Sequence, residues 1–422
     1  MSFFSELVST IFERRYQKAL QKEADGRTTA ELAEALLGST GEVSGMTLTR
    51  SILDRYAGMT KEDKLTFFEF MTHKLEINPK QVISTLKAYT KEPNKSTYRA
   101  FAEASEPKRQ ELARRLNQVP GATGQLVGMR KDLLDIIKDR PELGPLDVDF
   151  RHLFSSWFNR GFLVLRPINW SSPADILEKI IAYEAVHAID SWNDLRLRLK
   201  PIDRRCFGFF HPSMPNEPLI FVEVALTKGI PNSIQDLLAD EREAINAGDA
   251  DTAVFYSISN CQTGLAGISF GNSLIKQVAS DLARDLPRLS TFVTLSPIPG
   301  LNRWLETSKY AVDDSSQDQA LAAHYLLEAK KPDGTPFDPV ARFHLGNGAK
   351  VHAVHAMADT SDNGLKQSNG TMVNYLYDLS QISQNHEKFV ENNTVVASAT
   401  VKSLSASVTV SYTHLRAHET KC

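Results

Sequence analysis

Apolar residues recur at helical spacing through the first 139 or so residues of the chain. An amphipathic helix places a buried side chain every three or four positions. Five segments follow this rule: ELVSTIFERRYQKAL (6–20), AELAEALL (30–37), KLTFFEFMTHKL (64–75), QVISTLKAYT (81–90) and QLVGMRKDLLDIIKD (125–139). Helix starts are marked by Thr60 with Asp63 three residues later, and by Asn78 before Pro79. We therefore expect an all-helical bundle with a structural or oligomerising role, a second ligand site being the alternative.

The pattern changes after RPELGPLDVD (140–149), whose two prolines and glycine predict a linker. Short apolar runs typical of strands follow: GFLVLRPINW (161–170), RRCFGFFHP (204–212), PLIFVEVAL (218–226), DTAVFYSISN (251–260) and TFVTLS (291–296). SMPNEP would join the second and third as a hairpin. Helices are predicted over 171–187, capped by Ser172 with Pro173 at the first position, and over 272–286. This order of strands and helices predicts an α+β or α/β domain with a central strand–turn–helix–strand unit.

Two later segments, ARFHLGNGAKVHAVHAMAD (341–359) and TMVNYLYDLSQISQNHEKFVENN (371–393), are each predicted as a strand or turn followed by a helix. His352 and His355 are three apart, which places them on opposite faces of a strand. We interpret them as surface or packing residues rather than a metal pair.

Composition excludes several classes of protein. A net charge of −3 over 422 residues gives no sign of a nucleic-acid or anionic-membrane surface, so an anionic ligand needs local positive partners. No apolar run reaches the ~18 residues of a membrane span. The N-terminal segment carries Glu6 and Glu13, unlike a secretion or transit peptide. Three scattered cysteines do not form a disulfide scaffold, and a cytoplasmic location is expected.

The last residues, VSYTHLRAHET (410–420), resemble the translation of a sequencing-library adapter. His414, His418 and Cys422 recur every four residues, as metal ligands on one helix face would. We expect a disordered, non-native tail over 409–422 instead.

A glycine-rich turn lies between a strand and a helix in FYSISNCQTGLAGISFGNSLIKQV (255–278). Gly264, Gly267 and Gly271 would let backbone N–H groups approach an anion, and the helix N-terminus adds partial positive charge. No Gly-Lys-Ser/Thr follows, so the turn is not a Walker loop, and its spacing is not the dinucleotide fingerprint. Gln262, Gly264 and Ala266-Gly267 resemble the loop with which GNAT-type acyltransferases grip the pyrophosphate of coenzyme A. The plainer alternative is that these glycines only cap and turn the chain.

Four further segments extend the resemblance to a family. CFGFFHPSMPNEPLIFVEVALTKGI (206–230), the glycine turn, TLSPIPGL (294–301), VARFHLGNGA (340–349) and MVNYLYDL (372–379) occur in the order of malonyl-CoA decarboxylase, which the chain closely resembles from about 150 to 405. The resemblance implies an oligomeric α+β protein with an N-terminal all-helical bundle and a GNAT-like catalytic domain. We place the helical oligomerisation domain at 1–145 and the catalytic domain at 146–408.

The same resemblance implies the site residues. Ser296 would engage the malonyl end as proton acceptor, and His344 would be the proton donor. Asn374 and Tyr377 match family positions near that pocket. Residues Ala266 to Asn272 would lie along the CoA pyrophosphate, so the expected CoA-binding set is Gln262, Gly264, Leu265, Ala266, Gly267, Ile268, Ser269, Phe270, Gly271 and Asn272. Because some relatives carry glutamate where this chain has Ser269, no carboxylate role is assigned there.

The chemistry agrees with these residue types. Loss of CO2 from malonyl-CoA leaves a thioester enolate, which needs polar donors for the developing charge and an acid for the α-carbon. A serine held by Pro297-Ile298-Pro299 and a histidine with an ordinary pKa near 6.5 supply them. The thioester is the electron sink, so no metal, biotin, pyridoxal or other cofactor is expected, CoA being part of the substrate.

Three other interpretations remain open on the residues alone. An acyl-CoA-dependent N-acyltransferase would use the same CoA loop. An interaction protein with a degenerate CoA fold would explain the large helical region. Cys261, beside the glycine turn, could act as a thiol nucleophile if its pKa were lowered.

Overall fold

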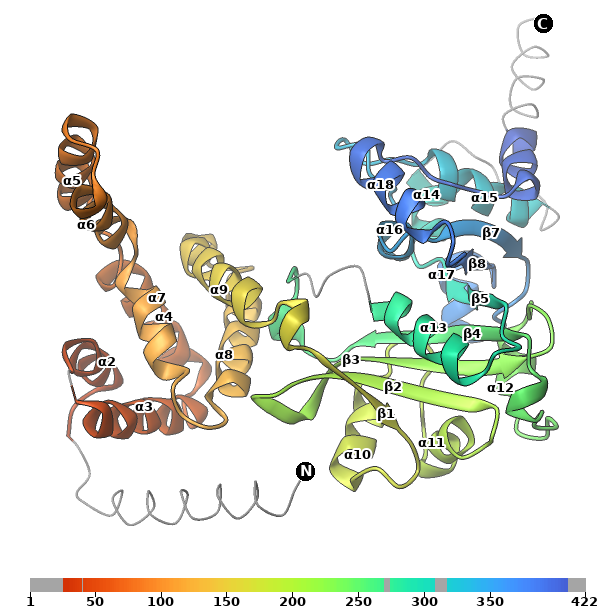
Figure 1. The fold of residues 1–422 in the computed structure, drawn as a ribbon, viewed down its shortest axis with the longest axis horizontal. Helices are drawn as coiled ribbons and strands as arrows, with labels where there is room; N and C mark the ends of the chain where they lie inside the picture. Colours follow the sequence, from red (N-terminus) through yellow and green to blue (C-terminus); the bar gives the residue numbers. More distant parts are fainter. Residues whose placement is uncertain (1–25, 40, 269–273, 308–316, 409–422) are drawn as a thin grey trace, which may run out of the picture. The chain divides into compact units, whose positions relative to one another are not determined.

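The computed structural model describes residues 26–39, 41–268, 274–307 and 317–408. The chain forms two compact units (Figure 1). Of the described residues, the first unit comprises those up to Phe158 together with Gln262–Ile268, and the second comprises Asn159–Cys261 and those from Leu274 onward.

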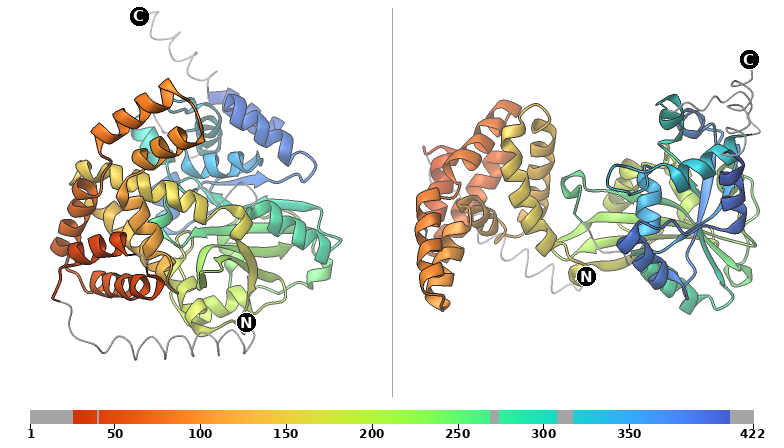
Figure 2. Two further views of the ribbon diagram at one scale, coloured as in Figure 1. Left: turned by 60° about the vertical axis from the view of Figure 1, so that its left-hand side comes forward. Right: turned by 90° about the horizontal axis from the view of Figure 1, so that it is seen from above.

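The described part of the first unit is helical (Figure 2). Its helices are α2 (Thr29–Gly38), α3 (Glu42–Ala57), α4 (Lys61–Lys74), α5 (Pro79–Lys91), α6 (Lys95–Ser105), α7 (Lys108–Leu116), α8 (Ala122–Ile136) and α9 (Gly144–Trp157). Four of the five helices predicted from periodicity are confirmed as α2, α4, α5 and α8; the segment 6–20 lies outside the described residues. Both predicted start signals are confirmed. Thr60 and Asp63 form a reciprocal capping box, and the Asn78 side chain accepts from the first backbone N–H groups of α5.

The predicted linker at 140–149 is wrong. These residues form a 3-10 helix (Pro141–Leu143) and the first turns of α9. Proline is well suited to the first helical positions, where no N–H is required, so Pro141 and the proline of α9 start helices here. Asp149 of α9 is buried in an ion pair with Arg109 of α7, and the compact helical unit continues beyond residue 145 to Phe158.

The second unit is built on a mixed sheet. Its strands are β1 (Val164–Ile168), β2 (Arg204–His211), β3 (Met214–Thr227), β4 (Thr252–Asn260), β5 (Thr291–Thr294), β6 (Ser296–Pro297), β7 (Lys350–His355) and β8 (Met372–Leu376). The sheet order is β1-β2-β3-β4-β5-β8-β6, and β7 also pairs with β8. The β2–β3 hairpin is confirmed, and β4–β5 is the parallel pair, connected through α13 (Leu274–Asp285). The α+β class and the strand–turn–helix–strand unit are therefore confirmed.

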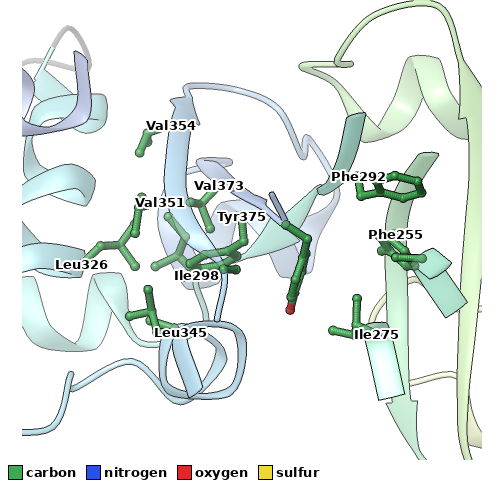
Figure 3. Packing of buried hydrophobic residues seen from close by; sticks show 14 of the residues in the cluster. Phe255, Ile275, Phe292, Ile298, Leu326, Leu345, Val351, Val354, Val373 and Tyr375 are labelled. Carbon is green, nitrogen blue, oxygen red and sulfur yellow. The ribbon is translucent and has the colours of Figure 1, made fainter. Parts of the chain in front are cut away.

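The other helices of this unit surround the sheet. They are α10 (Ala174–Tyr183), α11 (Trp192–Leu199), α12 (Ile234–Leu238), α14 (Leu301–Thr307), α15 (Asp318–Glu328), α16 (Pro339–Gly346), α17 (Asp362–Ser368) and α18 (Ile382–Asn392), and residues 399–408 are also helical. Helices α10 and α11 cover one face of β2 and β3, while α13 covers the other (Figure 1). On the α13 face the apolar core runs from Phe255 and Phe292 to Val373 and Tyr375 (Figure 3).

Two local predictions in this unit are wrong. Residues 341–346 belong to a helix, α16, and the strand β7 follows it, the reverse of the predicted order. The signal was Asp338-Pro339, a capping residue followed by proline at the first helical position. Helix α10 begins at Ala174 with Pro173 as its cap, because the Ser172 hydroxyl accepts from Asn169 N in the preceding turn instead.

Candidate active site

Ser296 and His344 lie together in the second unit. The Ser296 Oγ is 3.2 Å from the His344 Nε2, although 48 residues separate them in sequence. Ser296 begins β6, and His344 lies in the last turn of α16. The two residues are only 6% and 3% exposed, so the pair is enclosed by protein.

Strand alternation sets the direction of Ser296. Thr294, two residues earlier, points to the same side, and its Oγ1 accepts the Ser296 hydroxyl proton at 2.8 Å. The Tyr375 N–H of β8 donates to the same Thr294 oxygen at 3.1 Å. The end of β5 and the neighbouring strand thus hold the serine in one orientation.

The helix that carries His344 is tied to the segment that carries Ser296. Asp338 caps α16 by accepting from Ala341 N at 2.9 Å, and its carboxylate also accepts from Gly300 N, at the end of the SPIPG motif, and from the Tyr325 hydroxyl. A Cβ at position 300 would lie 2.2 Å from the Tyr325 hydroxyl oxygen, so glycine is required for this approach. One buried carboxylate therefore sets the serine segment and the histidine helix against each other.

Two tyrosines of the β8 segment complete the surroundings of the imidazole. The Tyr377 hydroxyl lies 2.7 Å from His344 Nδ1, and the Tyr375 ring stacks on the imidazole with centroids 4.5 Å apart and planes at 22°. Since the Ser296 proton points to Thr294, the Nε2 atom carries the proton of the serine contact. Nδ1 is then the acceptor for the Tyr377 hydroxyl. The row of hydrogen bonds runs from Tyr377 through His344 and Ser296 to Thr294.

The imidazole in this row is neutral. Burial lowers the pKa of His344 to about 3, because the charged form loses its hydration inside the protein. Burial likewise raises the pKa of Tyr377 far above its usual range, so its hydroxyl keeps its proton. The expectation of an ordinary histidine pKa near 6.5 is therefore wrong in this enclosed setting.

Asn374 makes no hydrogen bond with the dyad, Ser296 and His344, in the described part of the chain. It precedes Tyr375 on β8 and so points to the opposite face of the sheet. Its Nδ2 donates to Thr294 O at 2.7 Å, and its Oδ1 meets His355 Nε2 at 2.5 Å. The pairing register of β7 shifts between Val351 and Ala353, which leaves His352 between them as an extra residue.

The described part of the glycine turn, Gln262–Ile268, belongs to the helical unit. A Cβ at Gly264 would lie 1.9 Å from Val127 O of α8, so the turn packs backbone to backbone on that helix. Arg130 of α8 donates from Nη1 to Gly264 O at 2.7 Å and to Ala266 O at 2.9 Å. Gly264 is thus needed for close packing. The remaining expected CoA residues, Ser269, Phe270, Gly271 and Asn272, lie outside the described residues.

The thiol and metal alternatives gain nothing from the geometry. Burial raises the pKa of the Cys261 thiol, which opposes formation of a nucleophilic thiolate. Over the described ranges, no cluster of three or more His, Cys, Asp or Glu side chains has the arrangement of a metal site. His414, His418 and Cys422 lie outside those ranges.

Three residues that shape the site were missed in the sequence. Thr294 could have been found, since residues two apart on a strand share a face with Ser296. Asp338 carried the signal of a helix cap before proline. Tyr375 gave no signal of its own, because its contact with His344 depends on how β8 and α16 pack.

Comparison with known proteins identifies one family. The malonyl-CoA decarboxylase C-terminal domain matches residues 161–319 and 314–415, and the N-terminal domain of the same family matches residues 75–158. The mitochondrial malonyl-CoA decarboxylase of Anser anser anser is 34% identical over 351 residues, spanning 70% of this chain and 69% of that protein. The enzyme of Mus musculus is 32% identical and spans 71% of each.

Solved structures show the same fold. The malonyl-CoA decarboxylase from Rhodopseudomonas palustris matches 89% of this chain and 98% of its own, with 48% identity and a TM-score of 0.84. The one from Agrobacterium vitis matches 89% and 99%, with 47% identity and a TM-score of 0.85. The helical region followed by a mixed-sheet domain, which the resemblance describes as GNAT-like, is therefore confirmed, and the chain belongs to the malonyl-CoA decarboxylase family.

Proposed function

We propose that the chain converts malonyl-CoA to acetyl-CoA and CO2 at the site built around Ser296 and His344. The observation that carries this proposal is the enclosed row Tyr377–His344–Ser296, inside a chain that belongs to the malonyl-CoA decarboxylase family. The row offers a hydroxyl and an imidazole N–H side by side, which are the two groups the reaction requires.

The reaction begins when the Ser296 hydroxyl turns its proton from Thr294 to the malonyl carboxylate and holds it, so that the bond to CO2 stands out of the thioester plane. That carbon–carbon bond breaks, its electron pair moves into the thioester carbonyl, and CO2 leaves. The product is an enolate whose negative charge lies on the thioester oxygen. Fixed donors aimed at such a charge typically contribute about 100- to 1,000-fold in rate.

His344 then protonates the α-carbon. The Nε2–H proton moves to the carbon, a C–H bond forms, and the carbonyl is restored, giving acetyl-CoA. One proton from solvent returns to the imidazole, so that malonyl-CoA plus a proton balances acetyl-CoA plus CO2. A neutral imidazole suits this step, because an enolate is basic enough to take a proton from a weak acid, and Tyr377 keeps that proton on Nε2.

The remaining parts of the proposal concern CoA and cofactors. Backbone N–H groups within Ala266–Asn272, that of Gly267 among them, would bind the CoA pyrophosphate, in line with the anion-binding property of glycine turns at helix starts. The thioester accepts the electron pair, so the reaction as written needs no metal or organic cofactor.

Mutation of the dyad tests the mechanism. Ser296→Ala and His344→Gln should each lower kcat at least about 100-fold in an assay that follows acetyl-CoA formation. Each variant should still bind CoA, since neither side chain is assigned to the nucleotide. Ser380→Ala, an exposed hydroxyl after β8, is the control and should keep wild-type turnover. Wild-type turnover in either dyad variant would refute the assignment, and absence of acetyl-CoA from CoA-binding wild-type protein would refute the function.

Assembly and location are also proposed. Helix α5 has no buried residue, and Ile83, Leu86 and Tyr98 on α5 and α6 are 54%, 42% and 58% exposed. Such an apolar surface supports a homo-oligomer formed through the helical unit. Analytical ultracentrifugation of Ile83→Lys against wild type tests this.

No described helix combines the length and apolar character of a membrane span. Cys206 and Cys261 are unpaired, which supports a cytoplasmic location, to be tested by cell fractionation.

A further inference from the structure

We propose that Arg151, on helix α9 of the helical unit, is a substrate-binding residue that pairs with the pyrophosphate of CoA. This inference rests on the proposed function and assigns to the helical unit a part in ligand recognition. The juxtaposition behind it is that of the Arg151 guanidinium and Gly267 in the glycine turn.

Arg151 lies directly against the turn. A Cβ built at Gly267 would be 3.7 Å from Arg151 Nη2 and 3.8 Å from its Cζ and Nε. Gly267 has φ +74°, a conformation that favours glycine, so the turn presents bare backbone to the guanidinium. An anion bound along this backbone would therefore contact the Arg151 guanidinium.

Arg151 carries an exposed positive charge. Its side chain is exposed, and among the described residues it has no carboxylate at ion-pair distance. Its neighbour Arg130 differs on both counts, since Arg130 is buried, binds Asp147 at 2.8 Å and uses Nη1 to hold the turn. The two arginines therefore have different roles. Arg130 fixes the shape of the turn, and Arg151 places an exposed cation beside it.

The turn itself offers a second donor. No residue in the described ranges accepts a hydrogen bond from the Gly267 N–H, whereas the N–H groups of Ala266 and Ile268 bind carbonyls within the turn. A backbone N–H and a guanidinium at one place suit a phosphate oxygen, because guanidinium groups pair with phosphate through charge-assisted hydrogen bonds. In a chain of net charge −3 this local cation matters for an anionic ligand.

Binding measurements with truncated ligands test the proposal. Calorimetry with CoA, dephospho-CoA and pantetheine separates the pyrophosphate from the 3′-phosphate, which dephospho-CoA lacks, and pantetheine lacks both. Arg151→Ala should raise the Kd of CoA and of dephospho-CoA alike, by about tenfold, and leave that of pantetheine unchanged. Arg151→Lys should recover part of the loss, because it keeps the charge without the planar fork.

Lys131→Ala is the matched control. Lys131 is an exposed cation on α8, and it is not among the groups that lie nearest to the glycines in the described part of the turn. This variant should bind all three ligands as the wild type does, which separates a local contact from a general loss of positive charge. Raising the salt concentration should weaken CoA binding to wild type more than to Arg151→Ala, since the pair is exposed.

Equal Kd values for Arg151→Ala and wild type would overturn the inference. A loss seen with CoA but not with dephospho-CoA would also overturn it, since the arginine would then serve the 3′-phosphate. In decarboxylation assays, kcat/KM should fall with kcat unchanged. Because binding is measured with CoA itself, wild-type protein that binds CoA but forms no acetyl-CoA would refute the proposed function and leave this test intact.

Discussion

Replacement of Tyr377 by phenylalanine isolates the hydrogen bond that sets the proton on His344. The ring and its burial are retained, and only the hydroxyl 2.7 Å from His344 Nδ1 is removed. Nδ1 is then a buried acceptor without its donor, in a setting closed to water. Without the Tyr377 donor, the imidazole tautomer with its proton on Nε2, the atom that faces Ser296, is no longer favoured.

The size of the effect follows from the cost of a buried unsatisfied acceptor. That cost is about 1–3 kcal/mol, and a factor of ten in rate corresponds to about 1.4 kcal/mol, so kcat should fall by about 5- to 150-fold. KM should change little, because Tyr377 is not assigned to CoA. The same unsatisfied atom should lower the melting temperature by a few degrees.

Steady-state kinetics with malonyl-CoA and nitrogen NMR of the imidazole make the test. The wild type should show the proton of His344 on Nε2, and Tyr377→Phe should show a mixture of both tautomers. Leu379→Ala, at an exposed position shortly after β8, should behave as wild type. An unchanged kcat in Tyr377→Phe, or a wild-type imidazole protonated on Nδ1, would refute the proton assignment.

Three further predictions concern the turn, the acid range and the serine segment. Gly264→Ala should weaken CoA binding and lower the melting temperature, because a Cβ there would lie 1.9 Å from a backbone oxygen of α8; a variant that titrates like wild type would contradict the packing. Burial lowers the pKa of His344 to about 3 and that of His187 to about 4, against 6.5 in the unfolded chain, so the unfolded chain binds these protons first as the pH falls. The free energy of unfolding, measured in urea, should therefore fall from pH 6.5 toward pH 4 by up to about 1.4 kcal/mol per histidine and pH unit, and a smaller slope in His344→Gln is the check. Gly300→Ala should lower kcat, because its Cβ would reach within 2.2 Å of the Tyr325 hydroxyl oxygen and displace the Asp338 cap; turnover equal to wild type would remove that role.

The fold was predictable where a local pattern decided it. Helices α4 and α5 begin at the residues their capping signals named, and the β2–β3 hairpin and the unit from β4 to β5 follow the predicted order. The failures came from prolines and glycines interpreted as breaks. Residues 141–149 and 341–346 are helical, because a proline in the first turn starts a helix as readily as it interrupts a strand.

The site was predictable in its residue types but not in its protonation. Ser296 and His344 were named through a family resemblance, and the structure brings them to 3.2 Å. Their burial is a property of the packed core, to which Tyr375 and α16 contribute, and no local pattern reports it. Because burial lowers the pKa of His344, the ordinary histidine pKa taken from the residue type was wrong. The resemblance placed Asn374 near the pocket, whereas strand alternation points its side chain to the other face of the sheet.

The glycine turn shows most clearly what spacing leaves undecided. From the sequence, Gly264 and Gly267 were equivalent, two small residues that let an anion approach. The structure separates them, since Gly264 packs against the backbone of α8, whereas Gly267 has a positive φ and faces the exposed guanidinium of Arg151. Arg130 holds the turn by hydrogen bonds, and Arg151 lies beside it. Both arginines come from helices that precede the turn by more than a hundred residues, so the sequence around the turn does not reveal them. Loss of CoA affinity in Arg151→Ala, a change confined to α9, is therefore the result that the proposed arrangement requires.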